Sequence, residues 1–512
     1  MLSPSSGGYS FTAVLADEQA TEALMRDIAA LIEPGDLITL SGDLGAGKTT
    51  FARAFIRHAA GNDAIEVPSP TFTLMQVYEL PRFTLLHADL YRVNSPDELT
   101  ELGFDDLREG AVALLEWPDR AAGTLPPDRL DIELTLAPEQ GPSIRHVRVT
   151  GLGKFAAKAQ RMTHIRDFLA AHGFEDALRQ RIQGDASTRV YERLVRDGRT
   201  FVLMNAPRKP DGPPVRDGKP YSAIAHLAED VTPFIAMARG LAERGFSAPR
   251  ILYAERETGL LVLEDLGHEL VVRGEPPAPI EERYAAAVDV LAALHGMELP
   301  ETLSVEPGVE YRLPRYDRDA LSIELELLLD WYLPKLKSVI SASNRDTFVQ
   351  LWDQALTPAL EAPATWVLRD YHSPNLLWLP QQQGVARIGL LDFQDALMGP
   401  GAYDVASLLQ DARVDVPEAL ELSLLSRYVR ERHAADPSFD AVQFGQIYST
   451  LAAQRASKIL GIFARLEKRD RKPQYLRHMP RIWGYLQRSL AHPALAPLFD
   501  WYAKHIPAAD DF

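Results

Sequence analysis

The pattern of apolar and polar residues in the first part of the chain is typical of strands that alternate with helices. Segment 36–59, DLITLSGDLGAGKTTFARAFIRHA, begins with a short apolar run, passes through a glycine-rich turn, and ends with Phe51, Ala54, Phe55 and His58 at helical spacing. Three further apolar runs end in polar residues: VPSPTFTLMQVYE (67–79), LLHADLYRV (85–93) and VALLEWPDR (112–120). Because sites in α/β sheets form at the ends of strands, this pattern predicts an α/β domain with a site at that edge.

The second part of the chain shows strand-like runs that frame polar loops, followed by helical patterns. WVLRDYHSPNLLWL (366–379) and IGLLDFQDA (388–396) each place polar residues beside apolar runs. IELELLLDWYLPKL (323–336) is predicted to be an amphipathic helix. Its Glu324, Asp330 and Trp331 either face a substrate or belong to the core and the solvated face, and the second interpretation is favoured.

The length of 512 residues exceeds what one core supports, so two or three domains are expected. A Pro/Gly-rich stretch followed by basic, alanine-rich residues predicts a linker at 151–161, after a first domain at 1–150. Met162 then marks the start of a second domain at 162–512. The stretch 205–220, NAPRKPDGPPVRDGKP, is too rich in proline and glycine for a regular element and is expected to be a mobile loop.

The composition limits the compartment and the partners. No apolar run reaches the roughly 18 to 20 residues that a membrane helix needs, the chain has 0 cysteines, and it begins without the basic start of a signal peptide. A cytoplasmic protein without a membrane partner is expected. The net charge is -17, and residues 1–150 carry 11 Lys+Arg against 23 Asp+Glu. Because nucleic-acid binding depends on neutralising phosphates, no strong direct binding of nucleic acid is expected.

The glycine-rich turn carries the most specific chemical signal. Gly42, Gly47, Lys48 and Thr49 match the pattern G-x-x-x-x-G-K-[ST], in which backbone N–H groups and the helix amino terminus surround a phosphate. The lysine reaches the outer phosphates and the hydroxyl of Thr49 can ligate Mg²⁺. A plain glycine turn is the alternative. The predicted nucleotide-binding residues are Gly42, Asp43, Gly45, Ala46, Gly47, Lys48, Thr49 and Thr50.

With the S-P-T-F, H-x-D-x-Y-R and E-W-P motifs in order after this loop, residues 10–140 resemble TsaE, the small ATPase that helps to make threonylcarbamoyladenosine in tRNA. The resemblance implies that Glu116 positions Mg²⁺ with the loop threonine, that Trp117 borders the nucleotide, and that Asp89 is a second catalytic carboxylate. Thr71 would sense the terminal phosphate. Asp89 could instead cap a strand end, and His87 is expected to be structural.

The same resemblance implies that ATP is used and that the partners are the other subunits of the bacterial tRNA threonylcarbamoyl transferase complex. ATPases of this kind are slow alone and act on partner subunits. The excess of acidic residues in 1–150 favours protein partners over direct binding of tRNA.

The second half contains a second phosphoryl-transfer pattern. Asp370 and Asn375 stand in R-D-x-x-x-x-N, the spacing of a kinase catalytic loop, and Asp392 follows on an apolar run. In such a site one carboxylate accepts the proton of the substrate hydroxyl, while the asparagine and the second aspartate hold Mg²⁺. Asp370 is therefore the predicted catalytic residue, and Asn375 and Asp392 are predicted metal ligands. Two unrelated surface loops are the alternative.

Residues 162–505 resemble the aminoglycoside phosphotransferase-like kinases, and more specifically the N-acetylmuramate/N-acetylglucosamine kinases, which phosphorylate the anomeric hydroxyl in cell-wall recycling. The supporting segments are 184–207, LLVLEDLG (260–267), the two loops and GPGAYDVASLLQDAR (399–413). The resemblance implies a hinge at Glu264 to Leu266 that contacts adenine, and a structural role for Asp404. The lobes would comprise about 162–266 and 267–512.

One departure from the kinase pattern is visible in the strand RTFVLMNAP (199–207). Met204 and Asn205 stand where most such kinases place a phosphate-binding lysine. Lys209, Arg189 or Arg193 could substitute, and the choice stays open. Because Asp370 and Asp392 are both present, a variant kinase is favoured over a pseudokinase.

Together the two resemblances predict an α/β P-loop NTPase domain followed by an α+β, protein-kinase-like domain of two lobes. The favoured hypothesis is a bifunctional enzyme: an ATPase for tRNA modification joined to a kinase for a small sugar. One alternative is a kinase for another small hydroxyl substrate, such as an aminoglycoside or choline, that the P-loop domain regulates. A non-catalytic, kinase-like scaffold attached to the ATPase is the other.

Overall fold

The computed structural model describes residues 8–93, 98, 103–121, 123–141, 143–182 and 189–507. The chain divides into two compact units, Met1–Arg199 and Thr200–Phe512. Each unit is described by itself.

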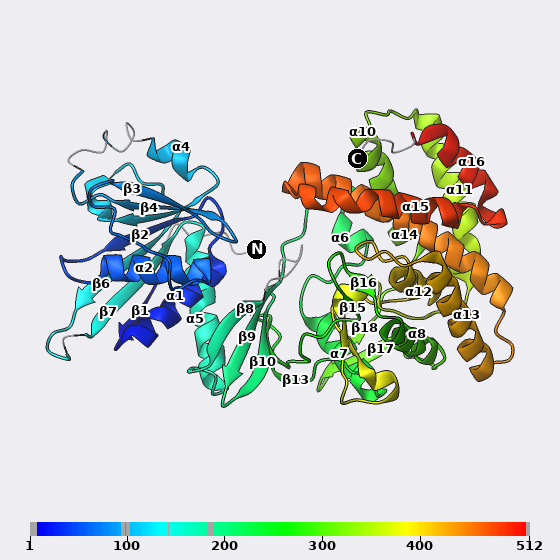
Figure 1. Cartoon of the computed structure of the whole chain (residues 1–512), viewed down its shortest axis with the longest axis horizontal. Coiled ribbons are helices and arrows are strands. Elements are labelled where there is room, and N and C mark those ends of the chain that lie inside the picture. Colours follow the sequence, from blue (N-terminus) through cyan, green and yellow to red (C-terminus); the bar gives the residue numbers. More distant parts are fainter. Residues whose placement is uncertain are drawn as a thin grey trace. The chain divides into compact units, whose positions relative to one another are not determined.

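The first unit is built around a seven-stranded mixed sheet in the order β1-β7-β6-β2-β5-β4-β3 (Figure 1). β2 pairs parallel with both β5 and β6, and β4 pairs parallel with β5. The remaining pairs, β1 with β7, β6 with β7 and β3 with β4, are antiparallel. The strands are β1 (Tyr9–Leu15), β2 (Leu37–Ser41), β3 (Met75–Glu79), β4 (Thr84–Asp89), β5 (Val112–Glu116), β6 (Arg129–Leu136) and β7 (Arg145–Leu152).

Helices cover this sheet, and its central strands are buried on both faces. The helices are α1 (Glu18–Leu31), α2 (Lys48–Ala60), α4 (Phe104–Arg108) and α5 (Phe155–Ala171). Ile38 and Leu40 of β2 belong to the core formed with α1 and α2, whereas Leu37 belongs to the core on the opposite face. Because parallel strands are covered on both sides, they appear in the sequence as continuous apolar runs.

Residues 151–161, which were expected to form a linker, lie instead at the end of β7 and in the first part of α5. Phe155, Ala159 and Met162 follow helical spacing and are buried in the core with α1 and α2. Met162, expected to mark the start of a separate domain, is 2% exposed. The basic, alanine-rich composition therefore belongs to a helix with one apolar face and not to a connecting segment.

A pair of antiparallel strands comes near the end of the first unit. β8 (Leu178–Ile182) pairs antiparallel with β9 (Val190–Arg196). The buried Arg179 of β8 donates to Glu192 of β9 through Nε at 2.7 Å and Nη2 at 3.0 Å, and it also forms an ion pair with Asp27 of α1. Buried charges are tolerated when they are paired in this way, so these contacts attach the pair of strands to α1.

The second unit combines short sheets with a large helical part. β10 pairs antiparallel with β14, which pairs antiparallel with β13. The strands are β10 (Arg199–Asn205), β11 (Pro214–Arg216), β12 (Lys219–Pro220), β13 (Ile251–Glu255), β14 (Leu260–Glu264), β15 (Val272–Arg273), β16 (Ala278–Pro279), β17 (Thr302–Glu306), β18 (Val309–Arg312), β19 (Thr365–Val367), β20 (Leu376–Trp378), β21 (Ile388–Leu390) and β22 (Leu397–Gly399).

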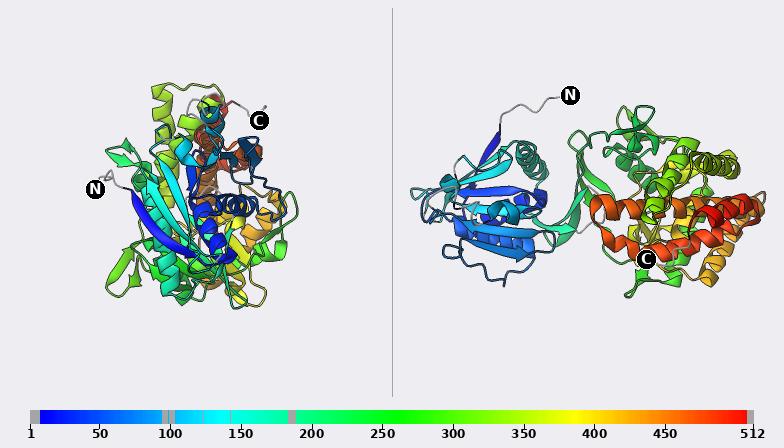
Figure 2. Two further views of the ribbon diagram at one scale, coloured as in Figure 1. Left: turned by 90° about the vertical axis from the view of Figure 1, so that its left-hand side faces the viewer. Right: turned by 90° about the horizontal axis from the view of Figure 1, so that it is seen from above.

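The long helix α14, which has 30 residues, packs against α9, α11, α12 and α15. Figure 2 shows α14 and α15, orange and red, running side by side. The helices are α6 (Tyr221–Ile224), α7 (Thr232–Glu243), α8 (Glu281–His295), α9 (Arg318–Leu327), α10 (Leu333–Lys335), α11 (Ala342–Glu361), α12 (Ala402–Leu409), α13 (Glu418–Ala435), α14 (Ala441–Asp470), α15 (Met479–Leu490) and α16 (Ala496–His505). Within the described part of the chain, no helix has both the length and the apolar character that crossing a membrane requires.

The expectation of an irregular loop at 205–220 is wrong in part. β11 and β12 form a short antiparallel hairpin, joined at Asp217 and Gly218. Both residues have positive φ, 49° and 74°. An Asp-Gly pair adopts this conformation readily, and turns with two such residues match the twist of paired strands. The prediction used the proline and glycine content of the segment and overlooked the Asp-Gly pair, which indicates a hairpin turn.

Candidate active sites

The glycine-rich loop lies between β2 and α2, as its pattern predicted. Gly42, Gly45 and Gly47 all have positive φ, and Gly47 is the residue that precedes α2. A side chain at Gly42 would approach the carbonyl oxygen of Leu134 to 2.2 Å, so no other residue fits there. The loop therefore exposes backbone N–H groups at the amino end of a helix, which is an arrangement that binds phosphate.

Lys48 is held inside this loop. Its Nζ donates to the carbonyl oxygens of Gly42 at 2.7 Å and Asp43 at 2.9 Å, and lies 3.5 Å from the ring centre of Trp117. The side chain is 5% exposed, and burial lowers its pKa. The ammonium group therefore stands at the centre of the loop, and the tryptophan expected to border the nucleotide is next to it.

One of the strand-end carboxylates lies directly beside this loop. Glu116, at the end of β5, accepts a hydrogen bond from Thr49 Oγ1 at Oε2, at 2.9 Å. Its other oxygen lies 2.9 Å from His87 Nε2, and both side chains are buried. Through this contact, His87 holds the carboxylate of Glu116 in position.

Asp89 is aligned with Glu116 in the parallel register of β4 and β5. Its Oδ2 accepts from Thr71 Oγ1 at 3.0 Å and from Ser69 Oγ at 3.3 Å. Its Oδ1 accepts from the N–H of Tyr91 at 2.9 Å, which is the contact expected of a strand-end cap. One oxygen of Asp89 therefore fixes the turn, and the other accepts from Thr71 and Ser69.

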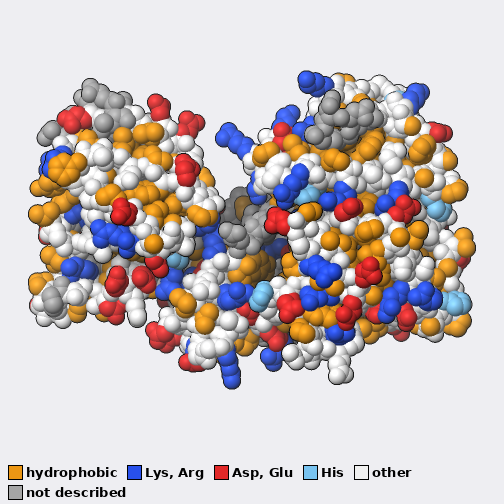
Figure 3. Space-filling model, viewed as in Figure 1, with side chains coloured by type: hydrophobic (Ala, Val, Ile, Leu, Met, Phe, Trp, Pro, Cys, Tyr) orange, Lys and Arg blue, Asp and Glu red, His pale blue; other side chains and the backbone are white. Residues whose placement is uncertain are grey.

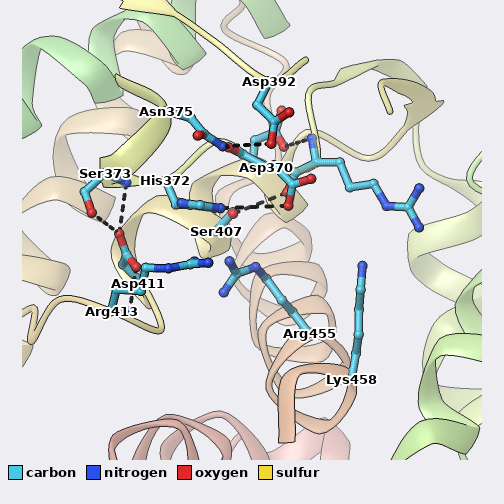
Figure 4. A network of polar contacts seen from close by, with 12 residues as sticks. Asp370, His372, Ser373, Asn375, Asp392, Ser407, Asp411, Arg413, Arg455 and Lys458 are labelled. Carbon is cyan, nitrogen blue, oxygen red and sulfur yellow. Dashed lines mark hydrogen bonds and ion pairs between the residues drawn. The ribbon is translucent and has the colours of Figure 1, made fainter. Parts of the chain in front are cut away.

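The catalytic loop of the second unit brings Asp370 and Asn375 together (Figure 4). Asn375 Nδ2 donates to the carbonyl oxygen of Asp370 at 3.0 Å and lies 3.5 Å from Asp392 Oδ2. β20 and β21, which follow Asn375 and precede Asp392, pair as a hairpin. The hairpin explains how residues separated along the chain reach one site. The side chain of Asp370 is 39% exposed, so its carboxylate is accessible.

Two buried aspartates anchor this loop from behind. Asp404 of α12 accepts from the backbone N–H groups of Leu368 at 2.6 Å and Arg369 at 2.8 Å. Asp411 accepts from the N–H and the Oγ of Ser373, at 2.9 and 2.6 Å. The carboxylates satisfy backbone donors that a buried loop would otherwise leave unpaired, so they fix the position of Asp370.

The expected hinge lies in the same unit. Glu264 ends β14, pairs with Phe201 of β10, and donates its N–H to the carbonyl oxygen of Arg250 at 2.8 Å. Leu266 follows two residues later. Met204 and Asn205, which replace the usual lysine, are buried at the end of β10.

Three basic residues are candidates for replacing that lysine, and they lie in or next to β9 and β10. Lys209 follows β10, and its N–H donates to the carbonyl oxygen of Glu229 at 3.0 Å. Arg193 belongs to β9 and Arg189 precedes it. The glycine turn expected at 184–188 lies outside the described residues. Which of the three replaces the lysine stays a prediction.

Glu324 does not face a substrate. It is 0% exposed and forms ion pairs with Arg369 and with Lys458, the latter at 2.7 Å. Burial alone would raise its pKa, but the two cations and their hydrogen bonds lower it to about 2. Of the other residues considered, Asp330 forms an exposed ion pair with Arg345 at 2.8 Å. The favoured interpretation of this helix, core and solvated face, agrees with these contacts.

We expect Glu324→Gln to lower the free energy of unfolding by about 3 to 5 kcal/mol, because it leaves two buried cations without their anion. Chemical denaturation measures the change. Asp330→Asn, which breaks an exposed ion pair, is the control and should cost no more than about 1 kcal/mol. Since the pKa of Glu324 is lowered from 4.5 to about 2, its stabilisation is present above the unfolded value and is lost as the pH falls toward 2. Equal effects of the two substitutions would contradict this role.

Sequence reasoning missed the charged residues around the catalytic loop. His372, Asp411, Arg413 and Arg455 lie to one side of Asp370 in Figure 4. Asp411 and Arg413 end the quoted segment 399–413, but nothing in their spacing connects them with the loop at 368–375. Arg455 belongs to α14 and carries no motif at all.

A phosphate-binding loop with two strand-end carboxylates, and a separate kinase-type loop with its second aspartate, define an enzyme with two phosphoryl-transfer domains. The family model of the phosphotransferase enzyme family matches residues 179–443. The model of the Threonylcarbamoyl adenosine biosynthesis protein TsaE matches residues 15–144. The chain belongs to the phosphotransferase enzyme family, and its amino-terminal region belongs to the TsaE family. Both predicted fold classes, and the prediction of ATPase and phosphotransferase chemistry that uses ATP, are confirmed.

Curated relatives match the two regions separately. An N-acetylmuramate/N-acetylglucosamine kinase of Caulobacter vibrioides is 40% identical over 355 residues, which are 66% of this chain and 95% of that protein. A protein of the same name from Pseudomonas aeruginosa is 36% identical, over 62% of this chain and 86% of that protein. The tRNA threonylcarbamoyladenosine biosynthesis protein TsaE of Rickettsia felis is 40% identical over 126 residues, 25% of this chain and 73% of that protein. The predicted fusion of two families is confirmed.

Proposed function

We propose that the chain is a bifunctional cytoplasmic enzyme. Its first domain is the ATPase subunit for threonylcarbamoyladenosine formation in tRNA, and its second phosphorylates the anomeric hydroxyl of N-acetylmuramate or N-acetylglucosamine in cell-wall recycling. The observation that supports this most is that each unit carries its own set of groups for phosphoryl transfer. The names of the relatives that match each region agree with the two activities.

In the first domain we assign the phosphates of ATP to the loop Gly42–Thr50 and the charge clamp to Lys48. The hydroxyl of Thr49 and the carboxylate of Glu116 already meet at 2.9 Å, and hard oxygen ligands of this kind fit Mg²⁺. Mg²⁺ would neutralise charge on the phosphates. We assign Asp89 to the orientation of the attacking water, because it faces Thr71 and is aligned with Glu116.

In the second domain we assign the general base to Asp370. Its carboxylate accepts the proton of the sugar hydroxyl as the new oxygen–phosphorus bond forms and the bond to the β-phosphate oxygen of ATP breaks, which releases ADP. Asn375 and Asp392 supply oxygens that fit Mg²⁺, which would reduce the charge on the phosphates. The adenine contact is assigned to the backbone from Glu264 to Leu266.

We propose that the partners of the ATPase are the other subunits of the threonylcarbamoyl transferase complex. On the face drawn in Figure 3, basic and acidic side chains are interspersed over the described residues and do not form one continuous basic area. Together with the acidic balance of residues 1–150, this supports protein partners over strong direct binding of nucleic acid.

A panel of acceptors tests the kinase assignment. With the full chain, ATP and Mg²⁺, we expect phosphorylation of N-acetylmuramate and N-acetylglucosamine, and none of choline or kanamycin. Transfer of labelled phosphate from ATP to each compound measures the outcome. Phosphorylation of kanamycin or choline alone would support the alternative kinase, and no transfer to any compound would favour the scaffold.

A further inference from the structure

Two arginines stand beside the catalytic loop of the second unit. Arg413 follows α12, and Arg455 belongs to α14. In Figure 4 their guanidinium groups point toward each other below His372. We call Arg413 and Arg455 the arginine pair. Lys458, drawn in the same view, is committed elsewhere, because its Nζ pairs with Glu324 at 2.7 Å and donates to Tyr403 Oη at 3.2 Å.

Arg455 is buried without an ion pair. The residue is 6% exposed, and its Nη1 donates to the carbonyl oxygen of Gln410 at 3.2 Å. Among the residues that the structure describes, no carboxylate lies within ion-pair distance of this guanidinium, which carries further N–H donors. Since a buried charge is costly unless it is paired, the site favours an anion.

Arg413 is fixed to the catalytic loop through a shared aspartate. The N–H of Arg413 donates to Asp411 Oδ1 at 2.8 Å, while Asp411 Oδ2 accepts from the N–H and the Oγ of Ser373. Asp411 is 0% exposed. The backbone at Arg413 therefore has a defined position relative to Asp370, three residues before Ser373 in the sequence.

The histidine between the arginine pair and Asp370 adds no positive charge of its own. Burial lowers the pKa of His372 to about 4; Asp411 and Asp370 act in the opposite direction, and both arginines lower it further. The arginines are thus within electrostatic reach of His372, whose Nε2 lies 3.9 Å from Asp370 Oδ1. Both guanidinium groups therefore place positive charge near His372.

We infer that the arginine pair binds the carboxylate of an anionic acceptor sugar and orients that sugar toward Asp370. The inference rests on the proposed function, because N-acetylmuramate carries a carboxylate on its lactyl ether and N-acetylglucosamine does not. Guanidinium groups bind carboxylates through paired, charge-assisted hydrogen bonds with defined direction. The pair therefore distinguishes two substrates that share the reacting hydroxyl.

The test compares both sugars with Arg413→Gln and Arg455→Gln in the full chain. For N-acetylmuramate we expect kcat/KM to fall roughly 10- to 100-fold, mainly through KM, because a hydrogen bond to a charged group is lost. For N-acetylglucosamine we expect a change of less than about 3-fold, since it makes no such bond. Arg427→Gln, which removes an arginine that pairs with Asp289 at 2.6 Å, is the control and should change neither value.

A second experiment uses a substrate without the carboxylate. With the unaltered chain, kcat/KM for the methyl ester of N-acetylmuramate should be lower than for N-acetylmuramate by a similar factor, because the ester lacks the carboxylate. Either arginine variant should lower kcat/KM for the ester little further, because the interaction that it removes is already absent. Equal losses for both sugars would assign the arginines a structural role, and a rise only in the KM for ATP would assign them to a nucleotide phosphate. Either result overturns the inference. If the unaltered chain phosphorylates neither sugar, the proposed function itself fails; if it phosphorylates only N-acetylglucosamine, the inference alone fails.

Discussion

Asp370→Asn is expected to lower the rate of sugar phosphorylation roughly 10²- to 10⁴-fold, the contribution of a positioned general base. The substitution keeps the size of the side chain and removes its ability to accept the proton of the sugar hydroxyl. Because the loop is fixed by Asp404 and Asp411, which accept from backbone and hydroxyl groups outside the Asp370 side chain, the fold should persist. Transfer of labelled phosphate to N-acetylglucosamine measures the change.

The matched control is Asp289→Asn. The Asp289 side chain is 36% exposed, close to the 39% of Asp370, and it pairs with Arg427 outside the catalytic loop. It should leave phosphorylation within about 2-fold, as expected for an exposed ion pair. Phosphate release at the P-loop site, measured without sugar, should be unchanged in both variants. An unaltered rate of sugar phosphorylation in Asp370→Asn would contradict the assignment of the base.

The parts of the two sites that could be predicted from the sequence are those formed within one loop, by adjacent strands or by a single hairpin. The phosphate loop requires only that Gly42 to Thr49 lie between one strand and one helix, and Gly42 leaves room for no side chain. Asp89 and Glu116 meet because adjacent parallel strands bring their ends to one edge of a sheet. In the second unit, β20 follows Asn375 and β21 precedes Asp392. Because these two strands pair as a hairpin, Asn375 and Asp392 lie close together.

The parts that the sequence could not predict depend on tertiary packing. Glu324 finds Arg369 and Lys458 on two other segments, and only that packing makes it a buried anion instead of a candidate for a sugar. Arg455 lies within α14 without a motif, so nothing connects it to Asp370 before the fold is known. Composition also failed at 151–161, because a basic, alanine-rich segment looks the same as a linker until Phe155 and Met162 are seen in the core.

Lys48→Ala is expected to lower ATP turnover at the P-loop site about 10²- to 10³-fold, comparable to the loss of one charge-stabilising group in a transition state. The ammonium group is the cation held inside the loop, where it donates to two backbone carbonyls and lies over Trp117. Alanine removes the charge that the phosphates require, while the glycines that shape the loop remain.

The measurement is cleanest when Lys48→Ala is made together with Asp370→Asn, because the kinase site then consumes little ATP and the remaining phosphate release reports the P-loop site. Lys154→Ala, which removes an ion pair with Asp36 at 3.1 Å in the same unit, is the control. Lys48→Ala alone should leave sugar phosphorylation within about 2-fold, since the two sites are chemically complete on their own. If it abolished sugar phosphorylation as well, the two-site mechanism would be wrong, and the P-loop domain would have to supply or regulate the kinase reaction.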